Sequence, residues 1–320
     1  MNPFPVSQQT ARRFLLESQQ LLSGQEVSTE SGNLEKTLKM VRKLECVQLD
    51  PVSVVERNQH LVLAARIPGY KPEYLNQLLY RGDVFEYIAN AACVIPIEDY
   101  PLFKPVRKRI WEQLEEPLEN SERAVKGVLK RLKNEGPLPS REFKSENRVH
   151  GYWDNKVAKT KETSHALNLL LDASIIRVVH REGNERYFNL TESSVPKKIL
   201  KEAETIGDLE ARRSLIDKYI RAYRLIDPRD SRFGWQKMTA AERRSEVDEL
   251  VKKEKLVPLQ IEHAKREYFI MTEDLYKLKE ISQTEPRNPV EGPVRFLSPL
   301  DNLLWSRERL ADLFGFHYRW

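Results

Sequence analysis

The chain has 320 residues, of which 40% are hydrophobic and 32% charged, so it suits a globular protein with two or three domains. Its apolar runs, such as Leu61–Ala65, are short, and the N-terminus lacks a signal-peptide pattern, so neither a membrane span nor export is predicted. Two cysteines without a CxxC pair, and histidines without HxxxH or HExxH spacing, predict no metal site and fit a reducing cytoplasm.

The positive charge is concentrated in one part of the chain. The whole sequence has 53 Lys and Arg against 48 Asp and Glu, and Asn120–Leu190 alone holds 14 basic and 9 acidic residues. A local basic surplus is typical of proteins that bind polyanions, and a solvated surface without a partner explains it equally well.

Helical periodicity dominates the sequence and strand patterns are few, so the predicted fold class is α+β and mainly helical. The predicted helices are 7–22, 34–45, 52–66, 72–81, 98–117, 121–134, 157–172, 209–225, 239–254, 273–282 and 301–313.

The clearest strand patterns form an internal repeat. The segments 175–190 and 256–270 each predict a β-hairpin, and a shift of 81 residues aligns Tyr187 and Phe188 with Tyr268 and Phe269. Each hairpin follows a predicted helix, and the second of these helices opens with the capping box Thr239…Glu242. Further upstream, each copy has another helix and a serine-arginine pair suited to helix capping, Ser140-Arg141 and Ser231-Arg232.

This order of elements is that of a winged helix, in which the third helix usually enters a major groove. We therefore predict tandem winged-helix units (helix-turn-helix plus β-hairpin). The expected divisions are 1–118, a winged-helix-like unit; 119–205, a basic unit; 206–284, a scaffold unit; and 285–320, a linker and the start of a C-terminal β-containing region.

The first copy differs from the second by about ten additional residues before its third helix. That insertion and the helix start mix basic and aromatic side chains, a composition that suits phosphate contacts and base stacking. The residues are Arg148, His150, Tyr152, Trp153, Lys156, Lys159 and Lys161.

Two polar residues stand inside an apolar stretch, "CVQLDPVSVV". Asp50 before Pro51 is a favoured way to begin a helix, and capping alone explains it. Gln48 has no such explanation, because an amide in an apolar segment needs hydrogen-bond partners. The glycines are too sparse for a phosphate-binding loop and GxSxG is absent, so nucleotide hydrolysis and serine-hydrolase chemistry are not predicted.

Four blocks in order resemble the bacterial winged-helix DNA glycosylases of the AlkZ/YcaQ type, which unhook interstrand crosslinks and remove N7-alkylated purines. The blocks are "CVQLDPVSVVERNQHLVLAARIPGY", "VFEYIANAACVIPIEDYP", "SREF" with "GYWDNKVAK", and "FLSPLDNLLWSRERLADLFGFHYR". The family signature is Gln-apolar-Gln or Gln-apolar-Asp. Family members continue beyond the last block into a β-rich region, so the region that begins after 285 is expected to be truncated at Trp320.

The resemblance implies a monofunctional DNA glycosylase of base excision repair, without cofactor or metal, in which Gln48 and Asp50 are catalytic. A carboxylate can orient the attacking water, and a helix N-terminus after Asp50 would favour its charged form. Asn90 stands where the family usually has a histidine, so we assign it no acid-base role. The implied partner is double-stranded DNA with alkylated or crosslinked purines, bound by a cytoplasmic, nucleoid-associated monomer. The expected DNA contacts are Arg57, His60, Asn90, Ser140, Arg141, Tyr152, Trp153, Lys156, Lys159 and Lys161.

Two other functions compete with this one. A catalytically silent winged-helix regulator would bind DNA without releasing any base. A scaffold for protein interactions would show no salt-dependent DNA binding.

Overall fold

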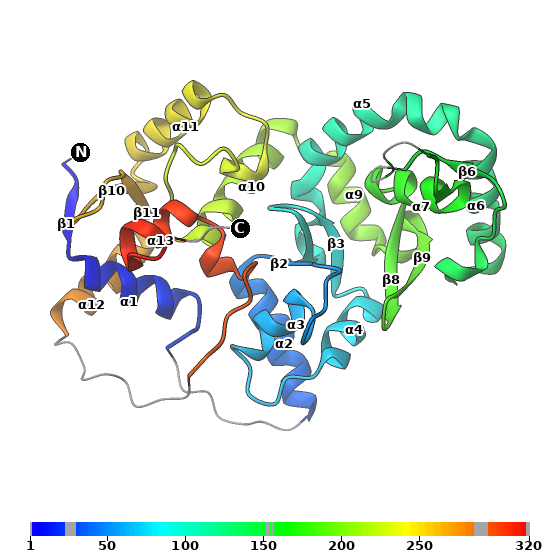
Figure 1. Cartoon of the computed structure of the whole chain (residues 1–320). Helices are drawn as coiled ribbons and strands as arrows, with labels where there is room; N and C mark the ends of the chain where they lie inside the picture. Colours follow the sequence, from blue (N-terminus) through cyan, green and yellow to red (C-terminus); the bar gives the residue numbers. More distant parts are fainter. Residues whose placement is uncertain (1, 23–29, 152–153, 155–156, 285–293, 318–320) are drawn as a thin grey trace. The chain divides into compact units, whose positions relative to one another are not determined.

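The computed structural model describes residues 2–22, 30–151, 154, 157–284 and 294–317 (Figure 1). The fold is a mixture of helices and short strands in which helices dominate, as the sequence predicts. The chain forms two compact units. Unit 1 comprises Met1–Lys71, Ala89–Ala91 and Ser214–Trp320, and unit 2 comprises Pro72–Ile88 and Ala92–Arg213. The four domain boundaries expected from the sequence stay a prediction.

Unit 1 has an apolar core around a three-stranded sheet, β1-β10-β11, in which β1 runs parallel to β10 and β10 antiparallel to β11. Side chains such as Phe14, Leu259 and Ile270 are buried together there. The elements around this core are β1 (Phe4–Val6), α1 (Gln8–Ser18), β10 (Leu256–Ile261), β11 (Tyr268–Met271), α12 (Leu275–Gln283) and α13 (Arg307–Phe314).

The remaining elements of unit 1 include the strand that carries the Gln-Leu-Asp motif. They are α2 (Glu30–Leu44), β2 (Val47–Gln48), α3 (Asn58–Ala64), α10 (Asp208–Tyr223), which begins in unit 2, the 3-10 turn η3 (Phe233–Trp235) and α11 (Ala240–Lys252). The predicted capping box at α11 is confirmed, since Thr239 and Glu242 each bond the other's backbone amide.

Unit 2 contains the first hairpin of the repeat, β8 (Ile176–Glu182) and β9 (Glu185–Leu190), as the sequence predicts. The turn between them uses Gly183 at a positive φ of 55°, a conformation that glycine adopts without steric cost. The other elements are α4 (Pro72–Arg81), β3 (Val84–Ile88), β4 (Ala92–Pro96), η1 (Ile97–Phe103), α5 (Lys104–Asn120), α6 (Glu122–Glu135), β5 (Leu138–Pro139), η2 (Ser140–Glu142), β6 (Arg148–Val149), β7 (Thr160–Lys161), α7 (Glu162–Asp172), α8 (Thr191–Ser194) and α9 (Lys197–Thr205).

The two copies of the repeat share a strand-pairing detail. In unit 2, Leu138 of β5 pairs with Phe188 of β9, and in unit 1, Ile226 pairs with Phe269 of β11. Phe188 and Phe269 are the residues that the 81-residue shift aligns. In each copy, therefore, the segment after the first helix returns to pair with the last strand of the hairpin.

Several predictions of local structure are wrong. The helix expected at 52–66 begins only at Asn58, and the one expected at 157–172 begins at Glu162. Ser140 and Ser231 do not cap α-helices, because each stands at or near a short 3-10 turn whose preceding residue makes no side-chain cap. The helix α9 was not predicted; its nine residues are short for the periodicity argument.

Candidate functional site

Gln48 is the last member of a hydrogen-bonded chain of side chains within unit 1. Its Oε1 accepts a hydrogen bond from Asn90 Nδ2 at 3.0 Å, and Asn90 Oδ1 in turn accepts one from the Tyr223 hydroxyl at 3.0 Å. Because burial raises the pKa of the Tyr223 phenol, the hydroxyl stays protonated and can donate. With Tyr223 as donor and Asn90 as relay, the Gln48 carbonyl oxygen is occupied and its Nε2 has no partner among the described residues.

Asp50 follows two residues after Gln48 and is partly buried. Its Oδ1 accepts a hydrogen bond from the Val52 amide at 2.7 Å, whereas in the described part of the chain its Oδ2 has no partner. The expectation that Asp50 caps a helix is wrong, because α3 begins at Asn58. The argument that a helix N-terminus favours its charge fails for the same reason, and the carboxylate instead closes a tight turn.

The first two residues of α3 form hydrogen bonds with the backbone of the motif. Asn58 Nδ2 donates to the Gln48 carbonyl oxygen at 2.5 Å, and Gln59 Oε1 accepts from the Asp50 amide at 3.5 Å. Both amide side chains are buried. The backbone on each side of Leu49 is therefore anchored to a helix, and the two polar side chains extend from a braced segment.

The other residues expected in this part of the site lie on or beside α3. Arg57 precedes the helix, and its amide bonds the Glu56 carboxylate at 2.7 Å. His60 is buried, and its Nδ1 lies 2.8 Å from the Tyr70 hydroxyl. The structure thus brings Gln48, Asp50 and Asn90 into one bonded cluster with α3, and His60 bonds Tyr70 instead of the motif side chains.

The last of the four sequence blocks, which is distant from the motif along the chain, contacts the backbone directly before it. Asn302 Nδ2 donates to the carbonyl oxygens of Leu44 at 3.2 Å and Cys46 at 2.8 Å, directly before β2. The adjacent Asp301 forms a bidentate ion pair with Arg66, at 2.7 and 2.9 Å, and both side chains are fully buried. This block therefore positions the strand that carries Gln48 and the end of the segment that contains α3.

A buried carboxylate before the motif, that of Glu45, is paired with two positively charged side chains. The Glu45 carboxylate bonds Lys218 Nζ at 2.9 Å and Arg221 Nε at 2.6 Å. Burial alone would raise the pKa of Glu45, but the charges and hydrogen bonds of Lys218 and Arg221 outweigh it and hold the pKa below its ordinary value. Glu45 is thus ionised at neutral pH and links α10 to the start of β2.

The expected DNA contacts of the basic copy lie in unit 2. Ser140 and Arg141 form η2, and Arg141 is paired with Glu185 at the tip of the hairpin. Lys159 and Lys161 are exposed and have no ion-pair partner among the described residues. Tyr152, Trp153 and Lys156 lie outside the described residues.

Asp154 holds the loop that presents these lysines. Its Oδ2 accepts hydrogen bonds of 2.9 Å from the amides of Gly151, Lys159 and Thr160 and from the Thr160 hydroxyl. These donors, the Gly151 amide first, hold the pKa of Asp154 well below its ordinary value. The antiparallel pair of β6 and β7 then continues the loop into α7.

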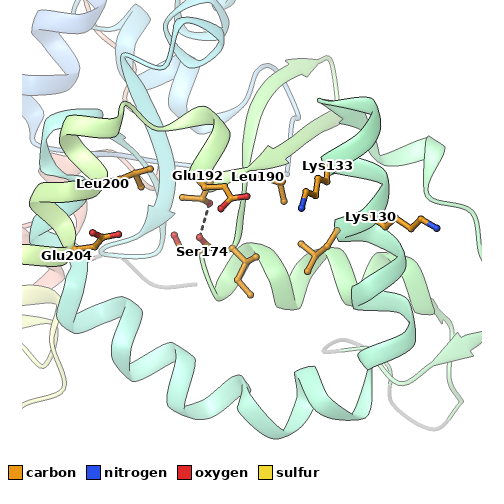
Figure 2. Close-up of a pocket in the computed structure, with 10 residues that line it drawn as sticks. Lys130, Lys133, Ser174, Leu190, Glu192, Leu200 and Glu204 are labelled. Carbon is orange, nitrogen blue, oxygen red and sulfur yellow. Dashed lines mark hydrogen bonds between the residues drawn. The ribbon is translucent and has the colours of Figure 1, made fainter.

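A separate pocket of about 490 Å³ lies in unit 2. Figure 2 shows Lys130 and Lys133 on one side of it, Leu200 and Glu204 on the other, and a hydrogen bond between Thr191 and Ser174. None of the predicted site residues lines this pocket. Within the described residues, no group of three or more His, Cys, Asp or Glu is arranged to hold a metal ion, and no described helix has the length and apolarity to cross a membrane.

Sequence reasoning missed the residues that orient the motif, namely Tyr223, Asn58, Gln59 and Asn302. Asn58 and Gln59 had a signal, because two amides open a helix whose next turn is apolar. Asn302 lies in the last of the four blocks, but nothing in that block predicts a contact with the motif. Tyr223 had no signal, since only the folded chain brings it near Gln48.

Two comparisons with known proteins match the chain. A family model described as "DNA glycosylase AlkZ-like" matches residues 41–320. The solved structure of the Streptomyces sahachiroi DNA glycosylase AlkZ is similar to this one with a TM-score of 0.56 and 15% sequence identity, over 88% of this chain and 74% of that chain. At this identity, the structural likeness supports the fold.

Proposed function

The chain belongs to the AlkZ-like DNA glycosylase family, and we propose that it hydrolyses the N-glycosidic bond of N7-alkylated purines in duplex DNA and unhooks interstrand crosslinks. The observation that carries this proposal is the cluster of Gln48, Asp50 and Asn90, in which the two motif side chains each keep one polar atom without a partner among the described residues. Those two atoms, Gln48 Nε2 and Asp50 Oδ2, are a donor and an acceptor.

A donor and an acceptor that extend from one short segment can hold a water molecule between them. Residues i and i+2 of an extended chain point to the same side, so Gln48 and Asp50 face one substrate. Asp50 accepts a proton of the water and raises its nucleophilicity, and Gln48 donates to the water oxygen or to an oxygen of the substrate. The hydrogen bond from Asn90 to its carbonyl oxygen orients the Gln48 amide so that Nε2 is available to donate.

The chemistry demands little more than this. N7 alkylation gives the purine a positive charge and makes it a good leaving group, so the protein mainly orients water and stabilises the developing positive charge on the sugar. The Asp50 carboxylate serves both purposes. The cluster of Gln48, Asp50, Asn90 and Tyr223 contains no primary amine, which favours water as the nucleophile and a monofunctional enzyme over one that forms a Schiff base.

The basic copy in unit 2 is the proposed duplex-binding element. Its order α6, β5, η2, α7, β8 and β9 is that of a winged helix, with β8 and β9 as the wing. Lys159 and Lys161 precede α7 on a loop fastened by Asp154, and we assign them to phosphate contacts. Arg141 is paired with Glu185, so its contact with DNA requires exchange of that partner.

The test is base release from a duplex with one N7-methylguanine and from a duplex with an interstrand crosslink between N7 positions. Replacing Asp50 by Asn preserves the acceptor for the Val52 amide but replaces the free oxygen with a donor. We expect base release to fall roughly 100- to 1000-fold, and to be abolished when Gln48→Ala is added. The control Glu73→Gln alters an exposed carboxylate in α4 of unit 2 and should leave the rate unchanged.

Unchanged base release in the double variant would refute the assignment of the two residues. Sequence-dependent DNA affinity with no release of any alkylated base by the wild type would favour the catalytically silent regulator instead. If the protein shows no salt-dependent binding to DNA at all, this result would favour a scaffold for protein interactions.

A further inference from the structure

An exposed apolar loop follows the Gln-Leu-Asp motif directly. Val52, Val54 and Val55 are 65%, 91% and 88% exposed, and they lie where the sequence predicts the first turn of a helix over 52–66. Valine is among the residues most often found fully buried, so three exposed valines within four positions are unusual for a folded chain. These three side chains form an apolar tip on the loop, which we call the valine tip, and it follows the proposed site in the chain.

The loop is held closed at its base by the same contacts that hold the motif. The Asp50 carboxylate accepts the Val52 amide at 2.7 Å, and Ser53 pairs with Arg57 across the loop in an isolated antiparallel bridge. Asn58, immediately after the loop, bonds the carbonyl of Gln48. The valine tip is therefore a short closed projection whose two ends are attached to the proposed catalytic segment.

The reach of the chain limits how far the tip lies from Asp50. Val54 follows Asp50 by four residues, and an extended residue spans at most about 3.5 Å, so the tip lies within about 14 Å of the carboxylate-bearing residue. Stacked bases are about 3.4 Å apart. Whatever places a damaged nucleotide at Asp50 thus places the valine tip within about four base steps of it.

We infer that Val54 and Val55 form an apolar wedge that inserts into the base stack beside the damaged purine. The occupant is the duplex itself, because the tip continues from a site proposed to act on a base in DNA, and this inference rests on that proposed function. Apolar side chains that enter a base step unstack it and kink the duplex. The wedge would open the stack so that the water held by Gln48 and Asp50 reaches the sugar of a base that a crosslink prevents from swinging out.

The test uses three variants. The first combines Val54→Ser and Val55→Ser, the second is the conservative combination of Val54→Leu and Val55→Leu, and the third, Val294→Ser, is a control. Val294 is 82% exposed outside the loop, so its replacement changes the surface to a similar degree. Each protein is mixed with a duplex that carries N7-methylguanine next to 2-aminopurine, whose fluorescence rises when it unstacks. Base release is measured from this duplex and from the same lesion in a single strand.

For the serine variant, we expect the fluorescence rise to disappear and duplex base release to fall roughly 10- to 100-fold, the scale of a lost unstacking of a few kcal/mol. Release from the single strand should change less than about threefold, since little stack has to be opened there. The leucine variant and Val294→Ser should behave as the wild type. Equal losses on both substrates, or a fluorescence rise that persists in the serine variant, would overturn the wedge.

The fluorescence readout separates this inference from the proposed function. If the wild type unstacks 2-aminopurine and the serine variant does not, the wedge is supported even when no base is released. If the wild type releases the base without any fluorescence change, the wedge is refuted and the proposed function stands. A dimer of the wild type that the serine variant cannot form would assign the valines to a second copy of this chain and would also refute the wedge.

Discussion

Removal of the Asp301 carboxylate should be among the most destabilising single changes in unit 1. Asp301 and Arg66 are both fully buried, and their bidentate contacts measure 2.7 and 2.9 Å. Loss of one partner leaves an uncompensated buried charge, which typically costs about 3 to 5 kcal/mol. Asp301 Oδ1 also accepts the Leu303 amide at 2.9 Å as a cap, and losing a cap costs about 1 kcal/mol. We therefore expect Asp301→Ala to lower the free energy of unfolding by about 5 kcal/mol.

Urea unfolding followed by circular dichroism measures this effect, and two further variants isolate its cause. Asp301→Asn preserves the oxygen that caps Leu303 and removes the charge, so it should lose less than Asp301→Ala. Adding Arg66→Met to Asp301→Ala should recover part of the loss, because no buried charge then remains. As a control, Lys39→Ala breaks an equally short but exposed pair with Glu35, at 2.7 Å, and should leave stability unchanged.

A loss below about 1.5 kcal/mol in Asp301→Ala would refute the reasoning from buried charge. The reasoning would also be refuted if the double variant lost as much free energy of unfolding as Asp301→Ala and Arg66→Met lose together, because additive losses mean that the two partners are not coupled. Because Asn302 adjoins Asp301 and bonds the backbone before β2, base release should fall in parallel with stability.

Three further predictions concern the site and its supports. Asn90→Ala should lower the rate of base release about fivefold with DNA affinity unchanged, because a lost bond of about 1 kcal/mol frees the Gln48 amide. Equal losses in rate and affinity would contradict a positioning role. Replacing Lys159 and Lys161 by Gln should reduce the slope of log affinity against log salt by about 2, measured by fluorescence anisotropy, whereas an unchanged slope would exclude both from phosphate contact. The pKa of Glu45 is lower in the folded protein than its unfolded value of about 4.3, so its ionised form stabilises the fold above that pH. Glu45→Gln should therefore lower the free energy of unfolding at neutral pH, and this difference from the wild type should vanish as the pH falls below that value. A gap in urea stability that persists at about pH 2 would contradict this pairing.

The first hairpin was predictable because strand patterns flank a turn with Gly183, and local sequence is enough to define such a turn. The capping box at Thr239 was predictable for the same reason, since the two residues that form it are three positions apart. The start of α3 was not. Asp50 and Pro51 have the composition of a helix start, but the chain forms a turn there and exposes Val54 and Val55. In that turn the Asp50 carboxylate binds the Val52 amide, a contact that competes with helix formation.

The sequence by itself determined which residues merit attention: Gln48 because an amide in an apolar segment needs partners, and the ordered blocks because their combination is specific. Only the tertiary structure decided what those residues can do. The Gln48 carbonyl is occupied by Asn90, which Tyr223 orients, and the three come from positions up to 175 residues apart. The direction of an amide depends on the donors that the fold brings to it, and no local pattern encodes them.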